Sequence, residues 1–449
     1  MPLRGLGVGG RGEAFRILLR VETGGAYASA LLRRLPEALE PRERALAHEL
    51  VLGTLRWQGW LEATLAPLAS RPPERLDPPV RIALRLGAYQ ILRMDRIPAA
   101  AAVDESVRLA RRAVGPGGAG YVNGVLRALC RARSAGPSIP AGSVEGLAVR
   151  TSHPGWLVAR RVRELGEAGA ARALAANNEP APLTLRANPA RGGVRALRER
   201  LEALGHETQP GRWSRRAVRM TAGAPPPALF REGWFAVQDE ASQLVTDLVA
   251  AAPGHRVLDV CAAPGGKATD VALGAGRPLV VAADLHPGRL RRVREERDRL
   301  GVPRMLLAVQ DATRPSLAPG TFDRVLVDAP CSGTGTLRRH PEIRWRLREE
   351  GIAALGALQT RILRAAVELV RPGGRIIFSV CSLEPEEGPE PVRVLLDSDS
   401  RLCPVHPRDL AAGIPEPLIA STGPCPHLST RPERDDVDGF FAAVLCRER

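Results

Sequence analysis

Two cysteines occupy positions where a thiol can act as a nucleophile. Cys331 closes the stretch Asp328-Ala-Pro-Cys331, which follows one apolar run, and Cys381 follows a second, GRIIFSV. A thiolate is strongly nucleophilic near neutral pH, so a cysteine in a turn beyond a strand suits covalent catalysis. Most buried cysteines are simply small core residues. We assign that ordinary role to the cysteines without chemistry-bearing neighbours: Cys130, Cys403, Cys425 and Cys446.

Another apolar run leads into a loop of small residues. After Asp259 the loop consists of Cys261, Ala262, Ala263, Pro264, Gly265, Gly266 and Lys267. Small side chains and glycines let the backbone approach a ligand closely, and the helix expected next offers its N-terminal N–H groups. The loop matches neither the GxxxxGK[ST] pattern of ATPases nor the GxGxxG pattern of NAD-binding proteins. Taken alone, Cys261 is interpreted as a core residue.

Further acids follow the next apolar runs. Asp284 ends one of them, at a spacing from the glycines where an acid can hold a pair of ribose hydroxyls. Asp311 follows the next run and is placed to accept a hydrogen bond from an adenine amino group. A single strand-end aspartate often caps a helix. Three acids at successive strand ends predict a cofactor that contains a nucleoside.

Together these residues suit methylation of carbon 5 of a cytosine, which is a poor nucleophile. A thiolate added to carbon 6 turns the ring into an enamine, and carbon 5 can then attack a methyl sulfonium. A carboxyl group near nitrogen 3 stabilises the developing charge, and Asp328 is the candidate. The carbon-5 proton must then leave and the thiolate be eliminated, steps that a second group such as Cys331 could assist.

The charge balance favours a polyanionic partner. Lysine and arginine number 64 against 49 acidic residues, which gives a net charge of +15, and such an excess is typical of nucleic-acid-binding proteins. Arg338, Arg339 and His340 follow the Cys331 loop, with Arg344 and Arg346 just beyond. We expect the first three to contact phosphates around a target base; a solvated basic face is the ordinary alternative.

The elements that must position these residues form an α/β domain. From about residue 235 onward, apolar runs alternate with helical patterns, and a last strand is expected in GFFAAVLCR. Repeated strand–helix units predict a mostly parallel sheet covered on both faces. Ligands bind beyond the carboxyl ends of such strands. Residues 233–449 are therefore expected to form a Rossmann-like domain.

The preceding chain is expected to form two further domains. Apolar residues recur at helical spacing over residues 13–130, with breaks that include GPGGAG at 115–120, so residues 1–135 are predicted to form an all-α bundle. The segment 134–146, rich in Ser, Gly and Pro, is predicted to be a linker. Residues 147–232 mix helical and strand patterns and predict a small α/β module.

The cysteines and the hydropathy of the chain indicate its compartment and argue against disulfides, a metal site and a membrane span. The seven cysteines lack paired spacing, so neither a disulfide scaffold nor a metal site is expected. A reducing cytoplasm is the compartment that such free cysteines favour. The first residues lack the apolar core of a signal peptide. No run of about 18 apolar residues occurs, so no membrane span is expected.

Three motifs resemble those of the RNA cytosine-5 methyltransferase superfamily, in particular its RsmB/Sun and NSUN group. They are LDVCAAPGGK, DAPCSGTGTLRRHPEIRW and SVCSLEPEE. The helical region 13–130 resembles the NusB-type RNA-binding domain of RsmB/Sun proteins, with segments such as RALAHELVLGTLRW and YVNGVLRAL. NNEPAPLTLRANP resembles the middle segment of that family, and GWFAVQDEASQLV resembles the entry to its catalytic domain. The resemblance covers nearly the whole chain.

This resemblance implies a role for each candidate residue. Cys381 corresponds to the family's nucleophile and Cys331 to the cysteine that assists product release. The CAAPGGK loop, Asp284, Asp311 and Asp328 correspond to contacts with S-adenosylmethionine, so Asp328 carries two compatible roles. The implied substrate is a single cytosine of the 16S RNA of the small ribosomal subunit. The expected partner is therefore ribosomal RNA, with neither DNA nor a membrane.

Two departures and two rival functions accompany the resemblance. Gly388-Pro389 stands where the family usually carries an asparagine after PEE, and VDGFF replaces a TDGFF-like element near the C-terminus. A DNA cytosine-5 methyltransferase is the nearest rival, because its nucleophile lies in a Pro-Cys motif like that of Cys331. A non-catalytic NusB-like RNA-binding factor is the rival of a different class. The second strand-end cysteine and the NusB-like region favour the RNA methyltransferase.

Overall fold

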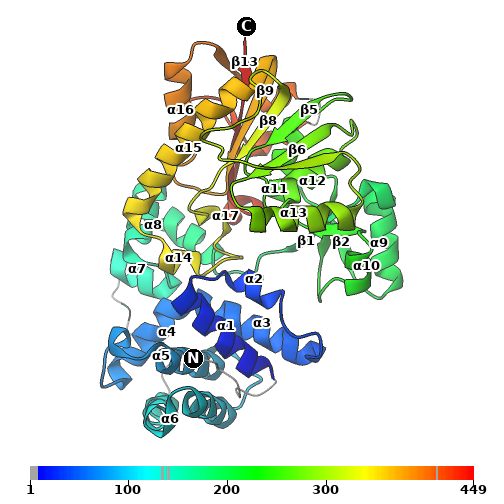
Figure 1. Ribbon diagram of the computed structural model, residues 1–449. Coiled ribbons are helices and arrows are strands. Elements are labelled where there is room, and N and C mark those ends of the chain that lie inside the picture. Colours follow the sequence, from blue (N-terminus) through cyan, green and yellow to red (C-terminus); the bar gives the residue numbers. More distant parts are fainter. Residues whose placement is uncertain (1–8, 133–135, 138, 140–141, 411–412, 449) are drawn as a thin grey trace. The chain divides into compact units, whose positions relative to one another are not determined.

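The computed structural model describes residues 9–132, 136–137, 139, 142–410 and 413–448 (Figure 1). The chain forms two compact units. The helical unit comprises the chain up to Pro180 together with Leu337–Leu347, and the sheet unit comprises Ala181–Thr336 and Arg348–Arg449. The short segment Leu337–Leu347 therefore leaves the sheet unit just after the Cys331 loop and belongs to the helical one.

The first part of the helical unit is a bundle, as predicted. Its helices are α1 (Gly10–Gly24), α2 (Ala28–Leu32), α3 (Pro41–Arg56), α4 (Gln58–Leu65), α5 (Pro78–Arg93) and α6 (Ala99–Ala132). Their apolar faces meet in one core around Phe15, Leu50 and Leu126. The break predicted at 115–120 is a kink within α6, where Gly115 has a φ of 82°. Glycine tolerates that left-handed backbone, and Pro116 follows it.

Two further helices, α7 (Val144–Thr151) and α8 (Gly155–Ala176), also belong to the helical unit. Ser143 caps α7 by accepting a hydrogen bond from Gly146 N, so the predicted linker 134–146 gives way to helix at its end. Its residues 134, 135, 138, 140 and 141, like 1–8 of the predicted bundle, lie outside the described residues. The predicted module 147–232 is divided, with its first helices in one unit and its strands in the other.

A small antiparallel sheet begins the sheet unit. Its strands are β1 (Leu183–Ala187), β2 (Thr208–Pro210), β3 (Ala217–Met220) and β4 (Phe235–Val237), in the order β2-β3-β1-β4. Helix α9 (Gly193–Ala203) packs Leu197 and Leu201 against it, and the short helix α10 is Pro227–Arg231. The buried Arg186 on β1 donates to Gly266 O and to Thr269 Oγ1. The small sheet is thereby tied to the start of α12 (Gly266–Leu273).

The main sheet has the predicted parallel centre. Strands β5 (Arg256–Asp259), β6 (Leu279–Asp284), β7 (Met305–Val309), β8 (Phe322–Asp328) and β9 (Val370–Val380) pair in parallel. The predicted last strand, β13 (Phe440–Arg447), joins β9 antiparallel. The shorter strands β10 (Leu402–Val405), β11 (Ile419–Ala420) and β12 (His427–Thr430) extend this edge. The order is β11-β12-β13-β9-β8-β5-β6-β7, with β10 beside β13.

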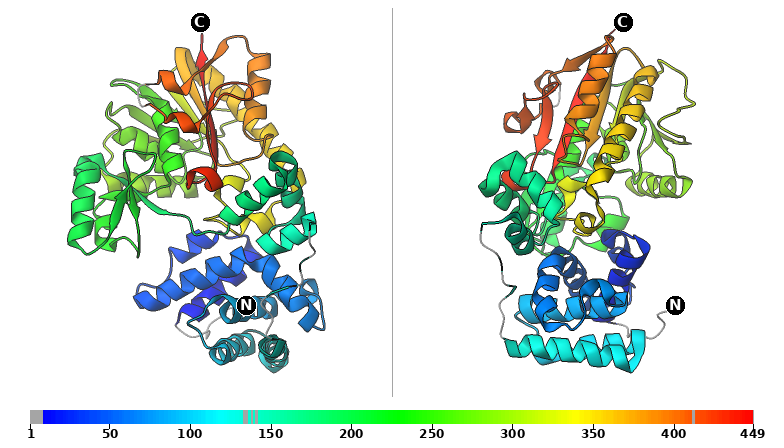
Figure 2. Two further views of the ribbon diagram at one scale, coloured as in Figure 1. Left: turned by 180° about the vertical axis from the view of Figure 1, so that it is seen from behind. Right: turned by 90° about the vertical axis from the view of Figure 1, so that its left-hand side faces the viewer.

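Helices cover both faces of this sheet (Figure 2). Neighbouring residues of a strand enter different cores, as Leu326 and Val325 of β8 do, because side chains alternate along a strand. One core contains α11 (Glu240–Val249), α12 and α13 (Pro287–Leu300); the other contains α15 (Glu349–Leu369) and α16 (Pro389–Ser398). The helix α17 is Pro432–Asp435. Among the described residues, every helix is too short or too polar to cross a bilayer.

The parallel centre determines where the candidate residues lie. Asp259, Asp284 and Asp328 are the last residues of β5, β6 and β8, and Cys381 comes directly after β9. Parallel strands place their carboxyl ends at one edge. Residues from distant parts of the sequence therefore meet there.

Candidate active site

The two candidate thiols are in contact. Cys331 Sγ and Cys381 Sγ lie 3.4 Å apart, and both side chains are partly exposed. The backbone adds a second link, because Gly335 N donates to Cys381 O over 3.0 Å. Neither thiol is sealed in the apolar interior. The structure thus brings together the two cysteines predicted to do chemistry.

Their mutual contact gives the two thiols different properties. The hydrogen bond with Cys381, followed by burial, raises the pKa of Cys331 well above that of an ordinary thiol. Cys331 therefore keeps its proton near neutral pH and can donate it toward the sulfur of Cys381. The pair thus makes Cys331 the thiol that holds its proton.

Asp328 lies beside this pair and is fixed by two donors. Its Oδ1 accepts from Ser379 Oγ over 2.8 Å, and its Oδ2 accepts from Lys267 Nζ over 2.7 Å. Ser379 is the partner of Asp328 across the β8–β9 pair, and Lys267 lies in the first turn of α12. The carboxylate is thereby held at the strand end with both oxygens engaged.

Lys267 supplies a positive charge at the same place. Burial lowers the pKa of its amine, but the charges of Asp328, Cys381 and Asp259 and the bond to Asp328 outweigh burial, so this pKa lies above its usual value. Lys267 is therefore protonated at neutral pH. The Lys267 cation therefore interacts electrostatically with both Asp328 and Cys381. The sequence placed Lys267 only in the cofactor loop, and its approach to the thiols is a finding of the structure.

The glycine loop turns sharply between β5 and α12. Gly265 has a φ of 109°, and a Cβ there would lie 3.1 Å from Val293 Cα. Only glycine fits such a backbone beside α13. Asp259 accepts from Cys261 N over 3.2 Å. Burial, reinforced by the charge of Asp328, raises the pKa of Asp259 to about 8, and burial also raises the pKa of the Cys261 thiol.

Asp284 and Asp311 differ in exposure. Asp284 is buried, and its two oxygens accept from His286 N over 3.0 Å and from Ala263 N over 3.2 Å. Asp311 is exposed; its Oδ1 accepts from Thr313 N and Thr313 Oγ1, bonds that lower its pKa. Within the described part of the chain, Oδ2 of Asp311 has no partner. Each carboxylate can therefore accept a further hydrogen bond. Asp284 could accept from ribose hydroxyls and Asp311 from an adenine amino group, as predicted for a nucleoside-containing cofactor.

The residues of the predicted basic cluster differ in exposure. Arg338 is only 5% exposed, and its Nη2 donates to Pro180 O over 3.0 Å. Burial, followed by the charges of Arg339 and Arg33, lowers the pKa of His340 to about 4, so this ring is neutral at pH 7. Contact of Arg338, Arg339 and His340 with RNA stays a prediction; Arg339 and His340 are partly exposed, whereas Arg338 is buried.

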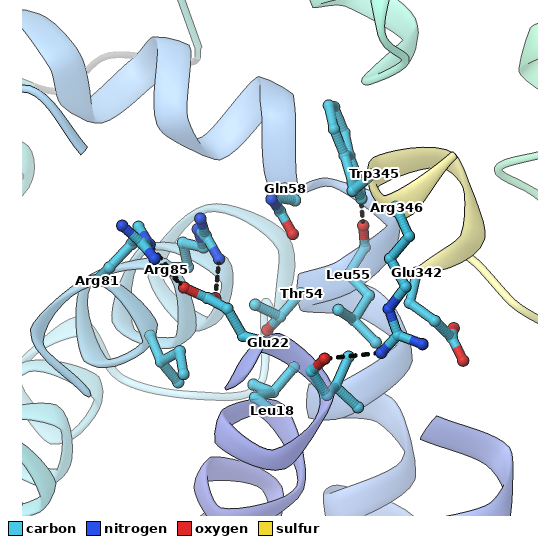
Figure 3. Close-up of a pocket in the computed structure, with 12 residues that line it drawn as sticks. Leu18, Glu22, Thr54, Leu55, Gln58, Arg81, Arg85, Glu342, Trp345 and Arg346 are labelled. Atoms are coloured by element: carbon cyan, nitrogen blue, oxygen red, sulfur yellow. Dashed lines mark hydrogen bonds and ion pairs between the residues drawn. The ribbon is translucent and has the colours of Figure 1, made fainter. Parts of the chain in front are cut away.

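The residues after this cluster pack into the helical unit. Arg344, in α14 (Ile343–Arg346), is fully buried; it donates to Asn178 Oδ1 over 2.8 Å, to Ser152 O over 3.1 Å and to Asn177 O over 3.2 Å. Figure 3 shows its neighbours Trp345 and Arg346 beside α3 and α1. Trp345 Nε1 donates to Leu55 O over 3.2 Å. These arginines anchor the segment Leu337–Leu347, a role that the sequence did not reveal.

One residue near the thiols escaped the sequence analysis. Glu387, the last acid of SLEPEE, is completely buried and accepts hydrogen bonds from Ser332 and Ser382. These serines directly follow Cys331 and Cys381. Its place within a motif next to Cys381 was the only available signal, because a run of acids usually marks a solvated surface.

The chain matches known families along most of its length. Residues 247–446 match the family described as 16S rRNA methyltransferase RsmB/F, and residues 10–131 match the NusB family. Residues 153–225 match the ferredoxin-like domain of RsmF/B-like methyltransferases. These matches cover the helical bundle, the segment that contains β1 and β3, and the main sheet.

Full-length relatives and solved structures agree with these matches. The chain is 36% identical to ribosomal RNA small subunit methyltransferase B of Pseudomonas putida, with 97% of each chain covered. It is 32% identical to the probable enzyme of that name from Bacillus subtilis, with 98% of each covered. The crystal structure of PH0851 superposes with a TM-score of 0.82 at 23% identity over 97% of this chain and 98% of that one.

A second solved structure has the same fold over a smaller share. It is NSun6 from Pyrococcus horikoshii with SFG, with a TM-score of 0.58 at 18% identity over 66% of this chain and 98% of that one. At such identities the likeness concerns the fold alone. Identity above 30% along the whole of the bacterial relatives, together with the matched domains, establishes the family. The chain belongs to the RsmB/F family of ribosomal RNA methyltransferases.

Proposed function

We propose that this protein transfers a methyl group from S-adenosylmethionine to carbon 5 of a cytosine in 16S ribosomal RNA, with Cys381 as the covalent nucleophile. The observation that carries the proposal is the 3.4 Å contact between Cys331 and Cys381, with Asp328 and the cation of Lys267 at the same strand ends. An RNA substrate is supported by relatives of this length that are named for the small-subunit ribosomal RNA.

The residues present fit S-adenosylmethionine. Asp284 and Asp311 offer carboxylate oxygens to ribose hydroxyls and to an adenine amino group. The small residues Ala262, Ala263, Gly265 and Gly266 lead into α12, whose first N–H groups can bind the carboxylate of the cofactor. When bound, S-adenosylmethionine supplies an electrophilic methyl group.

The chain's own groups account for the first half of the reaction. The Cys381 thiolate forms a bond from Sγ to carbon 6, and the electron pair of the carbon 5–carbon 6 double bond moves into the ring system. Negative charge develops at nitrogen 3 as this bond forms. Asp328, held by Ser379 and Lys267, is the group proposed to pass a proton to nitrogen 3, and the Lys267 cation stabilises the carboxylate that remains. Carbon 5 is thereby made nucleophilic enough to take the methyl group.

In the second half of the reaction, the contact between the thiols allows Cys331 to act as a base. Its pKa is raised first of all by the bond to Cys381. Once the Cys381 sulfur is bonded to carbon 6, it carries no charge and that cause is removed. Cys331 can then lose its proton to solvent more readily, and the resulting thiolate acts as the base that takes the carbon-5 proton. Breaking of the sulfur–carbon 6 bond restores the Cys381 thiolate.

A base inside a helix cannot reach these thiols, so the target cytosine must be unstacked. We therefore propose a single-stranded or loop nucleotide as the substrate. Arginines on the surface would contact the flanking phosphates, and binding would weaken with added salt.

Bisulfite mapping of 16S RNA tests the proposed function. The RNA is incubated with the protein in the presence or absence of S-adenosylmethionine. We expect one cytosine to become protected from bisulfite conversion only when both the protein and S-adenosylmethionine are present. Methyl transfer to another base, or to a ring position other than carbon 5, would overturn the proposal.

A further inference from the structure

Glu387 is a buried carboxylate with an unusual set of partners. It follows Cys381 by a few residues and is 0% exposed. Its Oε1 accepts from Ser332 N over 2.7 Å and from Gln359 Nε2 over 3.3 Å. Its Oε2 accepts from Ser382 Oγ over 2.6 Å and from Ser332 Oγ. Four donors from three segments of the sheet unit therefore converge on one side chain.

These donors are adjacent to both thiols. Ser332 follows Cys331, and Ser382 follows Cys381. The two serine hydroxyls also contact each other over 3.1 Å. Gln359, on α15, adds a bond to Pro330 O over 3.0 Å and so braces the residue before Cys331. Glu387 is thus the common partner of the two cysteine-bearing loops.

The free-energy cost of burying Glu387 indicates that this carboxylate does more than fill space in the core. Among the described residues, no arginine or lysine pairs with Glu387, and burial raises its pKa above that of an exposed glutamate. A buried acid without a cation is costly unless its hydrogen bonds are made. An apolar side chain would fill the space with less cost but could not orient the two serines.

We propose that Glu387 is a positioning residue, which sets the separation of the Cys331 and Cys381 sulfurs through Ser332 and Ser382. The inference rests on the proposed function, because that separation matters only if the thiols cooperate. Displacement of reacting groups by about 1 Å can cost on the order of 100-fold in rate. Each serine is expected to affect the half of the reaction that its neighbouring cysteine serves.

The test uses the full-length protein, 16S RNA and single-turnover conditions, with the covalent protein–RNA adduct measured on denaturing gels. Glu387→Gln should slow the reaction by about 10- to 100-fold without changing the affinity for S-adenosylmethionine. Ser382→Ala should slow formation of the adduct, whereas Ser332→Ala should slow its release so that adduct accumulates. Glu390→Gln makes the same change at an exposed glutamate of α16 and should behave as wild type.

A purely structural role would lower the melting temperature of all three variants and leave formation and release in their wild-type proportion. That result, or wild-type kinetics for Glu387→Gln, would overturn the inference. If Glu387→Gln does not fold, the opposite effects of the two serine variants still decide it. Retention of activity by Cys381→Ser would refute the proposed function, whereas an inactive Cys381→Ser beside an unaffected Glu387→Gln would refute only the positioning role.

Discussion

Cys331 and Cys381 are 50 residues apart in sequence, and their sulfur atoms lie 3.4 Å apart. The parallel pairing of β8 with β9 produces this proximity, because each cysteine lies just beyond the carboxyl end of one of these strands. Contact with Cys381 raises the pKa of Cys331, so Cys331 keeps its proton near neutral pH. The division of labour proposed for them therefore has a physical basis in this chain.

The charge of Lys267 should be needed for thiolate formation. Lys267→Met removes the cation that is bonded to Asp328 and felt by Cys381. We expect methyl transfer to fall by about 100- to 1000-fold, the range for loss of one preorganised donor, and its pH–rate profile to move to higher pH. Lys267→Arg keeps the charge and should retain the wild-type pH profile. A lower rate with an unshifted profile in Lys267→Met would contradict this role.

Arg344 should stabilise the helical unit. Arg344→Leu leaves Ser152 O, Asn177 O and Asn178 Oδ1 without their donor. Loss of three buried bonds is expected to lower the free energy of unfolding by about 3 kcal/mol, measured by urea unfolding of the helical signal. Arg348→Leu, at an exposed position four residues further on, should change it little. Equal midpoints for the two variants would be incompatible with the anchoring role.

Asp259 should make stability depend on pH. Its folded-state pKa of about 8 exceeds the value of about 3.9 in an unfolded chain, so the folded state binds the extra proton between these values. Its contribution is therefore fully present below about pH 4 and is lost as pH rises toward 8. Asp259→Asn removes this loss and keeps an acceptor for Cys261 N.

Melting temperatures at pH 5.5 and 8.5 test whether stability falls with rising pH as expected. The wild type should lose more stability over that interval than Asp259→Asn does. Asp311→Asn is the matched control, since the pKa of exposed Asp311 is lowered and the group stays ionised throughout. An Asp259→Asn variant that loses as much stability as the wild type would show that Asp259 is ionised in the folded protein.

Much of the sheet unit could be predicted because its strands and strand-end residues are marked by short, continuous stretches of sequence. Apolar runs such as those of β6 and β8 are long enough to mark buried strands, and the residue after each run falls at the ligand-binding edge. The positions of Asp284, Asp328 and Cys381 followed from that rule. The strands β2, β4 and β11 have only two or three residues, carry too little pattern and were missed.

Other features depend on partners far away in the sequence. Arg338 and Arg344 belong to an arginine-rich segment that sequence composition assigns to the surface, but backbone carbonyls of the residues after α8 receive their guanidinium groups. Two of the residues that donate to buried Glu387, Ser332 and Gln359, lie 55 and 28 residues away in the sequence. No local pattern distinguishes such polar residues from exposed ones.

In the proposed mechanism, Cys381 attacks the base and Cys331 releases it. This division is tested by incubating Cys381→Ser and Cys331→Ser with 16S RNA and S-adenosylmethionine and measuring the adduct that survives denaturing electrophoresis. We expect no adduct for Cys381→Ser and accumulated adduct for Cys331→Ser. Adduct and methylation by Cys381→Ser, with both lost in Cys331→Ser, would contradict it and make Cys331 the nucleophile.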